Sequence, residues 1–294
     1  MTHQTHERLA LPLKRNFARY ASATMDGSVY LFRSIAEFEA AEVPAGISSI
    51  AYGAGTLDLL LVHRPSQNLV VIFHAAADPA TVSLPIFVGQ GITQNLDASV
   101  LFVSDPALDF RIPIGWYTGD EKRHLQADLA RVIRHVASTV GAENIIFEGS
   151  SAGGFAALVY SHAFPGSLAM AVNPQTDIYR YHQGKVDEYL TACWGGGKPP
   201  AKETVTSAIE LYRESFPNYV LYLQNQRDEF HVMNHYEPWA QRFGELSGTR
   251  WTTIEGDWGD GHAPPPPFLQ EAILQYALSF EGHWDRLIRE GDFD

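Results

Sequence analysis

The chain has 294 residues, of which 45% are hydrophobic, with a formal net charge of −13 and a single cysteine, Cys193. This length and composition suit one large α/β domain with a sizeable core. The acidic balance argues against a nucleic-acid partner and against docking on anionic membranes through a basic patch. One cysteine permits no intrachain disulfide and is typical of a reducing compartment.

The first residues, from Met1 to Arg15, are polar and lack the continuous apolar stretch of a signal peptide. No run of about 18 apolar residues occurs in the sequence, so we expect no membrane span. These two features together predict a cytoplasmic protein.

Apolar runs separated by turn residues predict strands that alternate with helices. The predicted strands cover residues 29–33, 56–63, 69–73, 99–104, 145–147, 168–172, 219–225 and 250–255. Helices are predicted at 34–41, 121–139, 156–160, 186–193 and 232–243, and a last one begins near Phe268. Such alternation produces parallel βαβ units. We therefore predict an α/β fold with a doubly wound, mostly parallel sheet and helices on both faces.

Two segments are expected as additions to a single domain that spans residues 1–294. Residues 1–55 are predicted to extend the core sheet at its N-terminal side. Residues 178–212 are rich in Tyr, Gly and Pro and lie between two core strands, which is typical of an inserted cap or lid. The aromatic residues of this cap favour a substrate with an extended or sugar-like face. They are Tyr179, Tyr181, Tyr189 and Trp194.

The turn between the strand at 145–147 and the following helix carries the clearest chemical signature. Gly149-Ser150-Ser151-Ala152-Gly153 matches the pattern G-x-S-x-G, in which a sharp strand-to-helix turn raises a serine hydroxyl above the sheet. The backbone N–H of Ala152 would then face a developing oxyanion at the helix N-terminus. Only Ser151 has glycines at both −2 and +2, so it is the predicted nucleophile, and Ser150 is expected to form local hydrogen bonds.

Several chemically active side chains follow predicted strands directly. In a doubly wound sheet the functional loops lie at the carboxyl ends of the strands, so we expect these residues to meet at one edge. A serine hydroxyl needs a base to remove its proton, histidine suits that role near neutral pH, and a carboxylate fixes the imidazole tautomer. The residues in question are His74, Ser151, Asp177, Asp228 and His262.

From about Thr56 to the C-terminus the chain resembles the α/β-hydrolase superfamily, in its serine esterase and lipase branch. The resemblance rests on the turn at Ser151, the acid Asp228 after a later strand, and His262 after the last strand, in the order that the superfamily uses. It implies that Ser151 is the nucleophile, His262 the general base and Asp228 the orienting acid. It also implies ester cleavage through an acyl-enzyme, without a cofactor or metal.

The acid has alternatives in the sequence. Asp177 follows the preceding strand, where some α/β-hydrolases carry their acid, and Glu229 is adjacent to Asp228. Asp228 is favoured because it follows a clean strand and leads into a helix. Asp257 and Asp260 lie too close to the predicted base in sequence and are expected to shape its loop.

The base also has alternatives among the 12 histidines. His262 lies in a Gly- and Asp-rich loop after the last predicted strand, where the superfamily places its base. His231 and His235 are expected to be packing or surface groups. Their i, i+4 spacing could hold a metal, but no further ligand pattern supports one.

The second donor of an oxyanion hole is expected in the loop after the strand at 69–73. This loop, residues 74–77, resembles the His-Gly-Gly type of esterases, with alanines in place of glycines. Alanine adopts a positive φ only at a cost, so the loop is expected to differ in shape. Ala75 and Ala76 are the two candidate donors. Residues predicted to line the pocket are His74, Trp116, Tyr117 and Gln175.

The leading hypothesis is a serine hydrolase that acts on a small-molecule or glycan-linked ester, and a homo-oligomer is compatible with it. A peptidase is not excluded by any sequence feature. The same acyl-enzyme could instead pass its acyl group to a sugar or alcohol, and a dry, capped site would favour that outcome. The Gly-Ser-Ser-Ala-Gly-Gly turn is also loosely similar to that of certain bacterial proteins of glycan assembly and accessory secretion. A third class is a non-catalytic binding protein on the same fold.

Overall fold

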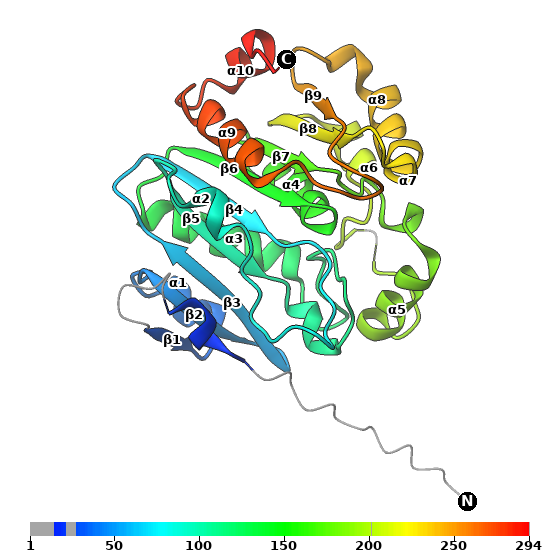
Figure 1. Ribbon diagram of the computed structural model, residues 1–294. Coiled ribbons are helices and arrows are strands. Elements are labelled where there is room, and N and C mark those ends of the chain that lie inside the picture. Colours follow the sequence, from blue (N-terminus) through cyan, green and yellow to red (C-terminus); the bar gives the residue numbers. More distant parts are fainter. Residues whose placement is uncertain (1–14, 22–27, 201, 294) are drawn as a thin grey trace, which may run out of the picture.

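The computed structural model describes residues 15–21, 28–200 and 202–293 (Figure 1). One sheet runs through the molecule with the strand order β1-β2-β3-β5-β4-β6-β7-β8-β9. Its strands are β1 (Val29–Phe32), β2 (Gly46–Tyr52), β3 (Gly55–Val62), β4 (Asn68–Phe73), β5 (Ser99–Ser104), β6 (Asn144–Ser150), β7 (Leu168–Val172), β8 (Tyr219–Asn225) and β9 (Trp251–Gly256). Figure 1 shows helices on both sides of the sheet, with β1 and β2 at one end and β8 and β9 at the other.

The α-helices connect these strands or cover the sheet. They are α1 (Ile35–Glu39), α2 (Gln90–Thr93), α3 (Leu125–Thr139), α4 (Ala152–His162), α5 (Gln183–Trp194), α6 (Ala208–Glu214), α7 (Glu229–His231), α8 (Glu237–Phe243), α9 (Pro267–Leu278) and α10 (Trp284–Glu290). Helical turns of other types are η1 (Phe17–Tyr20), η2 (Pro106–Phe110), η3 (Ile178–Arg180), η4 (Val232–Tyr236) and η5 (Gly244–Leu246). Within the described ranges no helix is both long and apolar enough to cross a membrane.

One strand of the sheet, β3, runs against its two neighbours. From β5 through β4, β6, β7 and β8 to β9 every neighbouring pair is parallel. The pairs β2·β3 and β3·β5 are antiparallel, whereas β1 pairs with β2 in parallel. After β4 the chain adds β5 on one side and then β6 on the other, which makes the carboxyl ends of β4 and β6 a topological switch point. Ligands of open α/β sheets bind at such points.

Apolar side chains fill the space on both faces of this sheet. On one face, residues of α9 and α10 pack against β4, β6, β7 and β8 in a single core cluster. On the other face, α3 and α4 cover β3 to β6 in a second cluster. A third cluster joins α4, α5, α6 and α8 over β7 and β8. The predicted doubly wound, mostly parallel sheet with helices on both faces is therefore confirmed.

The structure also adds elements that the periodicity did not indicate. β2 was not predicted, because Ser48 and Ser49 interrupt its apolar pattern, yet both are buried and the Ser49 hydroxyl bonds the Asp58 carboxylate at 2.5 Å. α3 begins at Leu125 rather than at residue 121, since Asp120 and Arg123 pair across a turn. The short helices α2, α6 and α10 were likewise not predicted.

The two predicted additions to the core have different surroundings. β1, α1 and β2 fall within residues 28–55 and join the sheet at its end, while residues 1–14 and 22–27 lie outside the described residues. The described part of residues 178–212, which leaves out residue 201, contains η3, α5 and most of α6, between β7 and β8. Tyr189 of α5 is fully buried and bonds the Thr118 hydroxyl at 2.8 Å, so this segment packs on the loop before α3.

Glu148 of β6 makes stability depend on pH. Its neighbours in register are Ile72 and Met170, it is 3% exposed, and burial raises the pKa of its carboxyl to about 8. A pKa raised by folding means that the stabilising contribution is complete below about pH 4.5 and is lost as the pH rises toward 8. We expect the stability of wild type relative to Glu148→Gln to fall by about 1.4 kcal/mol per pH unit in this window. Urea unfolding of both proteins from pH 5 to 8 measures this slope, and parallel stability curves would contradict it.

Candidate active site

The chain turns sharply between β6 and α4, and Ser151 is the residue at the turn. Its backbone has φ 59° and ψ −116°, a strained conformation for a residue with a side chain. A Cβ atom on Gly149 would overlap the backbone of Gly153, and one on Gly153 would overlap the carbonyl of Phe73 at the end of β4. The two glycines of the G-x-S-x-G pattern are thus required by close backbone contacts, which hold Ser151 at the switch point.

The Ser151 hydroxyl is buried and hydrogen-bonded. Its Oγ accepts a hydrogen bond of 2.8 Å from Nε2 of Gln175, which follows β7. The other end of that amide, Oε1, accepts from Nε1 of Trp116 at 3.2 Å. Ser151 is 3% exposed and Gln175 is fully buried, so the hydroxyl is shielded from bulk water in this conformation.

Asp228, directly after β8, contacts two histidines. Nδ1 of His262 lies 2.5 Å from Oδ2 of the carboxylate, and Nδ1 of His231 lies 2.9 Å from the same oxygen. The backbone N–H of His231 also donates to Oδ1, at 3.1 Å. The two imidazole rings stack with their centroids 3.8 Å apart. One carboxylate therefore orients both rings.

These contacts set the charge state of the group. Burial alone would raise the pKa of Asp228, but hydrogen bonds from His231 and His262 outweigh it and lower that pKa well below its usual value. Burial lowers the pKa of His231, although the hydrogen bond to Asp228 acts in the opposite direction. The carboxylate is thus ionised and His231 neutral at pH 7, and the 35% exposed side chain of His262 is the ring nearest to solvent.

The candidate acids differ in their surroundings. The carboxylate of Asp177 caps η3 by accepting a hydrogen bond of 2.9 Å from the backbone N–H of Tyr179. Glu229 is exposed at the start of α7. Of the three, only Asp228 contacts a histidine in the described part of the chain.

His231 occupies a place that the sequence reasoning missed. It was expected to be a packing or surface group, but its Nε2 lies 2.8 Å from Nε2 of Gln175 while its Nδ1 faces Asp228. His235, expected in the same class, is a packing group whose Nδ1 accepts the backbone N–H of Thr176 at 3.2 Å. The spacing of Asp228 and His231 over one helical turn, with Asp228 as the N-cap, is the signal that could have identified the pair.

Two asparagines at strand ends hold the loop of His262, and the sequence reasoning missed them as well. Nδ2 of Asn225 donates to the carbonyls of Gly259 and Gly261, each at 2.8 Å. Nδ2 of Asn173 donates to the carbonyl of Ala263 at 2.9 Å, and its Oδ1 accepts the backbone N–H of Asn225 at 2.7 Å. The residues before and after His262 are thereby fixed to the ends of β7 and β8.

The loop after β4 brings two backbone amides close to the turn that carries Ser151. Ala77 donates its N–H to the carbonyl of Pro113, while the amides of Ala75 and Ala76 have no hydrogen-bond partner among the described residues. Gly153 of α4 lies directly against the carbonyls of Phe73 and His74, so the loop borders the nucleophile turn. Ala152 begins α4, where the first N–H groups lack partners within the helix. Three amides are thus candidates for an oxyanion hole.

The predicted pocket residues lie in the wall of the site rather than on an open surface. Both ring nitrogens of His74 are engaged, Nδ1 with the Ala75 carbonyl at 2.6 Å and Nε2 with the N–H of Asp105 at 3.0 Å. The Tyr117 hydroxyl accepts the N–H of His74 at 2.7 Å. His74, Trp116, Tyr117 and Gln175 are all buried in this conformation, as Ser151 is. Their lining of a substrate pocket stays a prediction.

A metal ion is geometrically conceivable at Asp228, His231 and His262, whose ligand atoms lie within 4.8 Å of one another. The hydrogen bonds favour a different use of these groups. Nε2 of His231 faces an N–H of Gln175 and must accept, so the imidazole proton lies on Nδ1, between the ring and Asp228. A metal at Nδ1 would have to displace that proton, so the donor set fits proton transfer better than metal binding.

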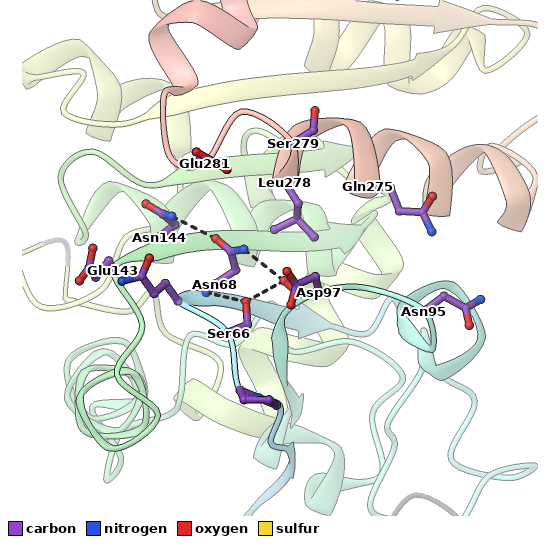
Figure 2. A pocket seen from close by; sticks show the side chains of 12 residues that line it. Ser66, Asn68, Asn95, Asp97, Glu143, Asn144, Gln275, Leu278, Ser279 and Glu281 are labelled. Atoms are coloured by element: carbon purple, nitrogen blue, oxygen red, sulfur yellow. Dashed lines mark hydrogen bonds between the residues drawn. The ribbon is translucent and has the colours of Figure 1, made fainter.

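An open polar pocket lies at the amino ends of the strands, opposite the ends that bear Ser151. Figure 2 shows Asn68 at the start of β4 and Asn144 at the start of β6, joined by a hydrogen bond of 3.0 Å, with Ser66 and Asp97 beside them. These positions are at the amino ends of the strands, whereas Ser151 follows the carboxyl end of β6. This pocket therefore does not belong to the site around Ser151.

Comparisons with known proteins give the following similarities. A family model described as uncharacterised protein family UPF0227 matches residues 109–248, a range that includes Ser151 and Asp228 but ends before His262. No curated protein matches the chain.

Among solved structures, esterase B from Lactobacillus rhamnosis has a TM-score of 0.54 and 13% identity over 81% of this chain and 84% of that chain. The glycosylation-associated Gap123 complex from Streptococcus agalactiae has a TM-score of 0.54 and 12% identity, over 82% and 47%. The capsule O-acetyltransferase of Neisseria meningitidis serogroup A has a TM-score of 0.50 and 16% identity, over 76% and 89%. The chain spans less than half of several solved chains that it matches, namely 33%, 47% and 42% of their lengths.

Proposed function

We propose, from the premise that the chain has the α/β-hydrolase fold, that it is a serine hydrolase that cleaves a carboxylic ester through an acyl-enzyme. The observation that carries this proposal is a strained serine at the turn into α4, combined with an Asp228–His262 pair that is hydrogen-bonded at the same ends of the strands. Strain of this kind is retained where it serves a function. The substrate class is a small-molecule or glycan-linked ester.

Each group has a defined role in this reaction. Ser151 attacks the ester carbonyl while His262, whose Nδ1 faces Asp228, takes the hydroxyl proton at Nε2. The resulting imidazolium is stabilised by the ionised Asp228 and then protonates the leaving alcohol. Water, activated by the same histidine, releases the acid and restores Ser151.

The oxyanion of the tetrahedral intermediate would be held by the amide of Ala152 and by that of Ala75 or Ala76. Helix N-termini favour negative charge, and the alanine amides are unpaired in the described part of the chain. Loss of one such donor typically costs about 3 kcal/mol of transition-state stabilisation.

The same acyl-enzyme could transfer its acyl group to a sugar or alcohol, and one observation favours this second function. Ser151 is 3% exposed, and Tyr181 of the cap segment 178–212 lies against both Trp116 and His231, with ring centroids 5.8 and 6.0 Å apart. A site that excludes water protects an acyl-enzyme from hydrolysis until an acceptor arrives. Glycan O-acetylation would be an example of such chemistry.

Turnover of p-nitrophenyl acetate tests the proposal and separates these functions. We expect a burst of nitrophenol equal to the enzyme concentration, followed by a slower steady release. If added sugars or alcohols raise the steady rate and appear as acetylated products, the protein is a transferase, whereas free acetate alone indicates a hydrolase. A folded protein that releases no nitrophenol above background would instead support a non-catalytic binding protein.

A further inference from the structure

A second chain of hydrogen bonds leads from Asp228 to Ser151 without passing through His262. It runs from the Asp228 carboxylate to Nδ1 of His231, from Nε2 of His231 to Nε2 of Gln175, and from that nitrogen to Oγ of Ser151. The three contacts measure 2.9, 2.8 and 2.8 Å, and all four residues are buried. The scheme with one nucleophile, one base and one acid gives no role to its two central members.

The direction of every hydrogen bond in this chain follows from Trp116. The indole Nε1 is a donor only, so the atom of Gln175 that faces it must be the carbonyl oxygen Oε1. The NH₂ group of Gln175 therefore faces Ser151 and His231 and supplies one hydrogen to each. His231 accepts at Nε2, which places its own proton on Nδ1, where Asp228 accepts it.

This polarity leaves the Ser151 hydroxyl ready to react. Because Oγ accepts from Gln175 with a lone pair, its own hydrogen is free to point elsewhere. Nε2 of His262 is the acceptor expected for it, since Nδ1 of that ring is occupied by Asp228. An N–H donor on Oγ also stabilises negative charge that develops there as the proton leaves.

We propose that Gln175 and His231 are positioning residues, which hold the Ser151 hydroxyl with its hydrogen directed away from Gln175 and toward His262. This inference rests on the proposed function, because it concerns how the nucleophile is prepared. Asp228 then has two roles, since it fixes the tautomer of His262 directly and the orientation of Gln175 through His231.

The surroundings of His231 keep it in the required state. The groups that face it are Asp228, His262, His182 and His235, with the ring of Tyr181 6.0 Å away. His262 becomes positively charged during the reaction and stacks on His231, so a neutral His231 avoids repulsion between the two rings. A protonated His231 could not accept a hydrogen bond from Gln175, so the chain of hydrogen bonds from Asp228 to Ser151 would be interrupted.

The rate at which a fluorophosphonate probe labels Ser151 tests whether Gln175 and His231 position its hydroxyl. A second readout is kcat and KM for p-nitrophenyl acetate. Gln175→Met keeps the volume but removes both donors, and His231→Leu removes the acceptor. His231→Gln restores an amide oxygen near the position of Nε2. The matched control is His235→Asn, which replaces a buried histidine one helical turn away and keeps an acceptor for the backbone N–H of Thr176.

We expect labelling to slow by roughly 10- to 100-fold in Gln175→Met and in His231→Leu, with a loss in kcat and little change in KM, because the nucleophile is misdirected rather than the substrate lost. His231→Gln should recover most of the rate, and His235→Asn should label like wild type. The proposal is overturned if folded Gln175→Met labels at the wild-type rate, or if His231→Gln is as slow as His231→Leu. If His231→Leu does not fold, Gln175→Met and His231→Gln decide the question against wild type. Failure of wild type itself to label would refute the proposed function, and this inference with it.

Discussion

Ser151→Ala is expected to lower kcat for any true substrate by roughly 10⁴- to 10⁶-fold, because no other group at the site can form the acyl-enzyme. Ser151 occupies the strained position between β6 and α4, and its hydroxyl accepts a hydrogen bond from Gln175. The substitution leaves the turn glycines and their close contacts unchanged. The variant should therefore fold like wild type, apart from about 1–3 kcal/mol for the unpaired amide of Gln175.

The control for this variant is Ser150→Ala, which removes the neighbouring hydroxyl from the end of β6. It should retain activity of the same order as wild type, since Ser150 is the last residue of β6 and does not occupy the strained turn position of Ser151. Turnover measured with both variants and circular dichroism of each would separate loss of the nucleophile from loss of the fold. Substantial activity in Ser151→Ala together with loss in Ser150→Ala would move the nucleophile to Ser150.

Asp228→Asn is expected to lower kcat by about 10⁴-fold, the loss that follows when the acid of such a triad can no longer fix the tautomer of its histidine. The effect here has two sources, because the carboxylate accepts from Nδ1 of both His231 and His262. An amide in its place presents an N–H to one of the rings, and the imidazolium formed in the reaction loses its counter-charge. KM should change little, since Asp228 is buried beneath the rings.

Asp177→Asn is the matched control for this substitution. Asp177 caps η3, and asparagine is an equally good cap, so its replacement should change neither kcat nor stability appreciably. Steady-state kinetics of the two variants with the same ester provide the comparison. A larger loss for Asp177→Asn than for Asp228→Asn would place the acid after β7.

The fold class and the ends of the strands at which the candidate site lies could both be predicted from the sequence, because both follow from short-range patterns. Apolar runs located the core strands β4 to β9 to within a few residues, and the rule that function follows the carboxyl ends of strands brought Ser151, Asp228 and His262 to one edge. β2 was not predicted because polar residues such as Ser49 interrupt its apolar pattern. Ser49 is buried because its hydroxyl bonds Asp58 on β3, and a local pattern does not reveal such a partner.

The details of the site depend on contacts between residues far apart in the chain. Gln175 reaches His231, 56 residues away, and Asn225 reaches Gly261, 36 residues away. No local pattern specifies such pairs, so they require coordinates. The two ring nitrogens of His74 bond main-chain atoms of Ala75 and Asp105, and the second contact exists because β5 ends beside β4.

Labelling with a fluorophosphonate probe, followed by mass mapping of the adduct, on wild type and on His262→Ala tests directly whether Ser151 is a nucleophile activated by His262. We expect an adduct on Ser151 that forms at least about 100-fold more slowly without His262, because general-base catalysis contributes on that order. Folded wild type that forms no adduct, or an adduct on Ser151 that forms equally fast in His262→Ala, would contradict this expectation.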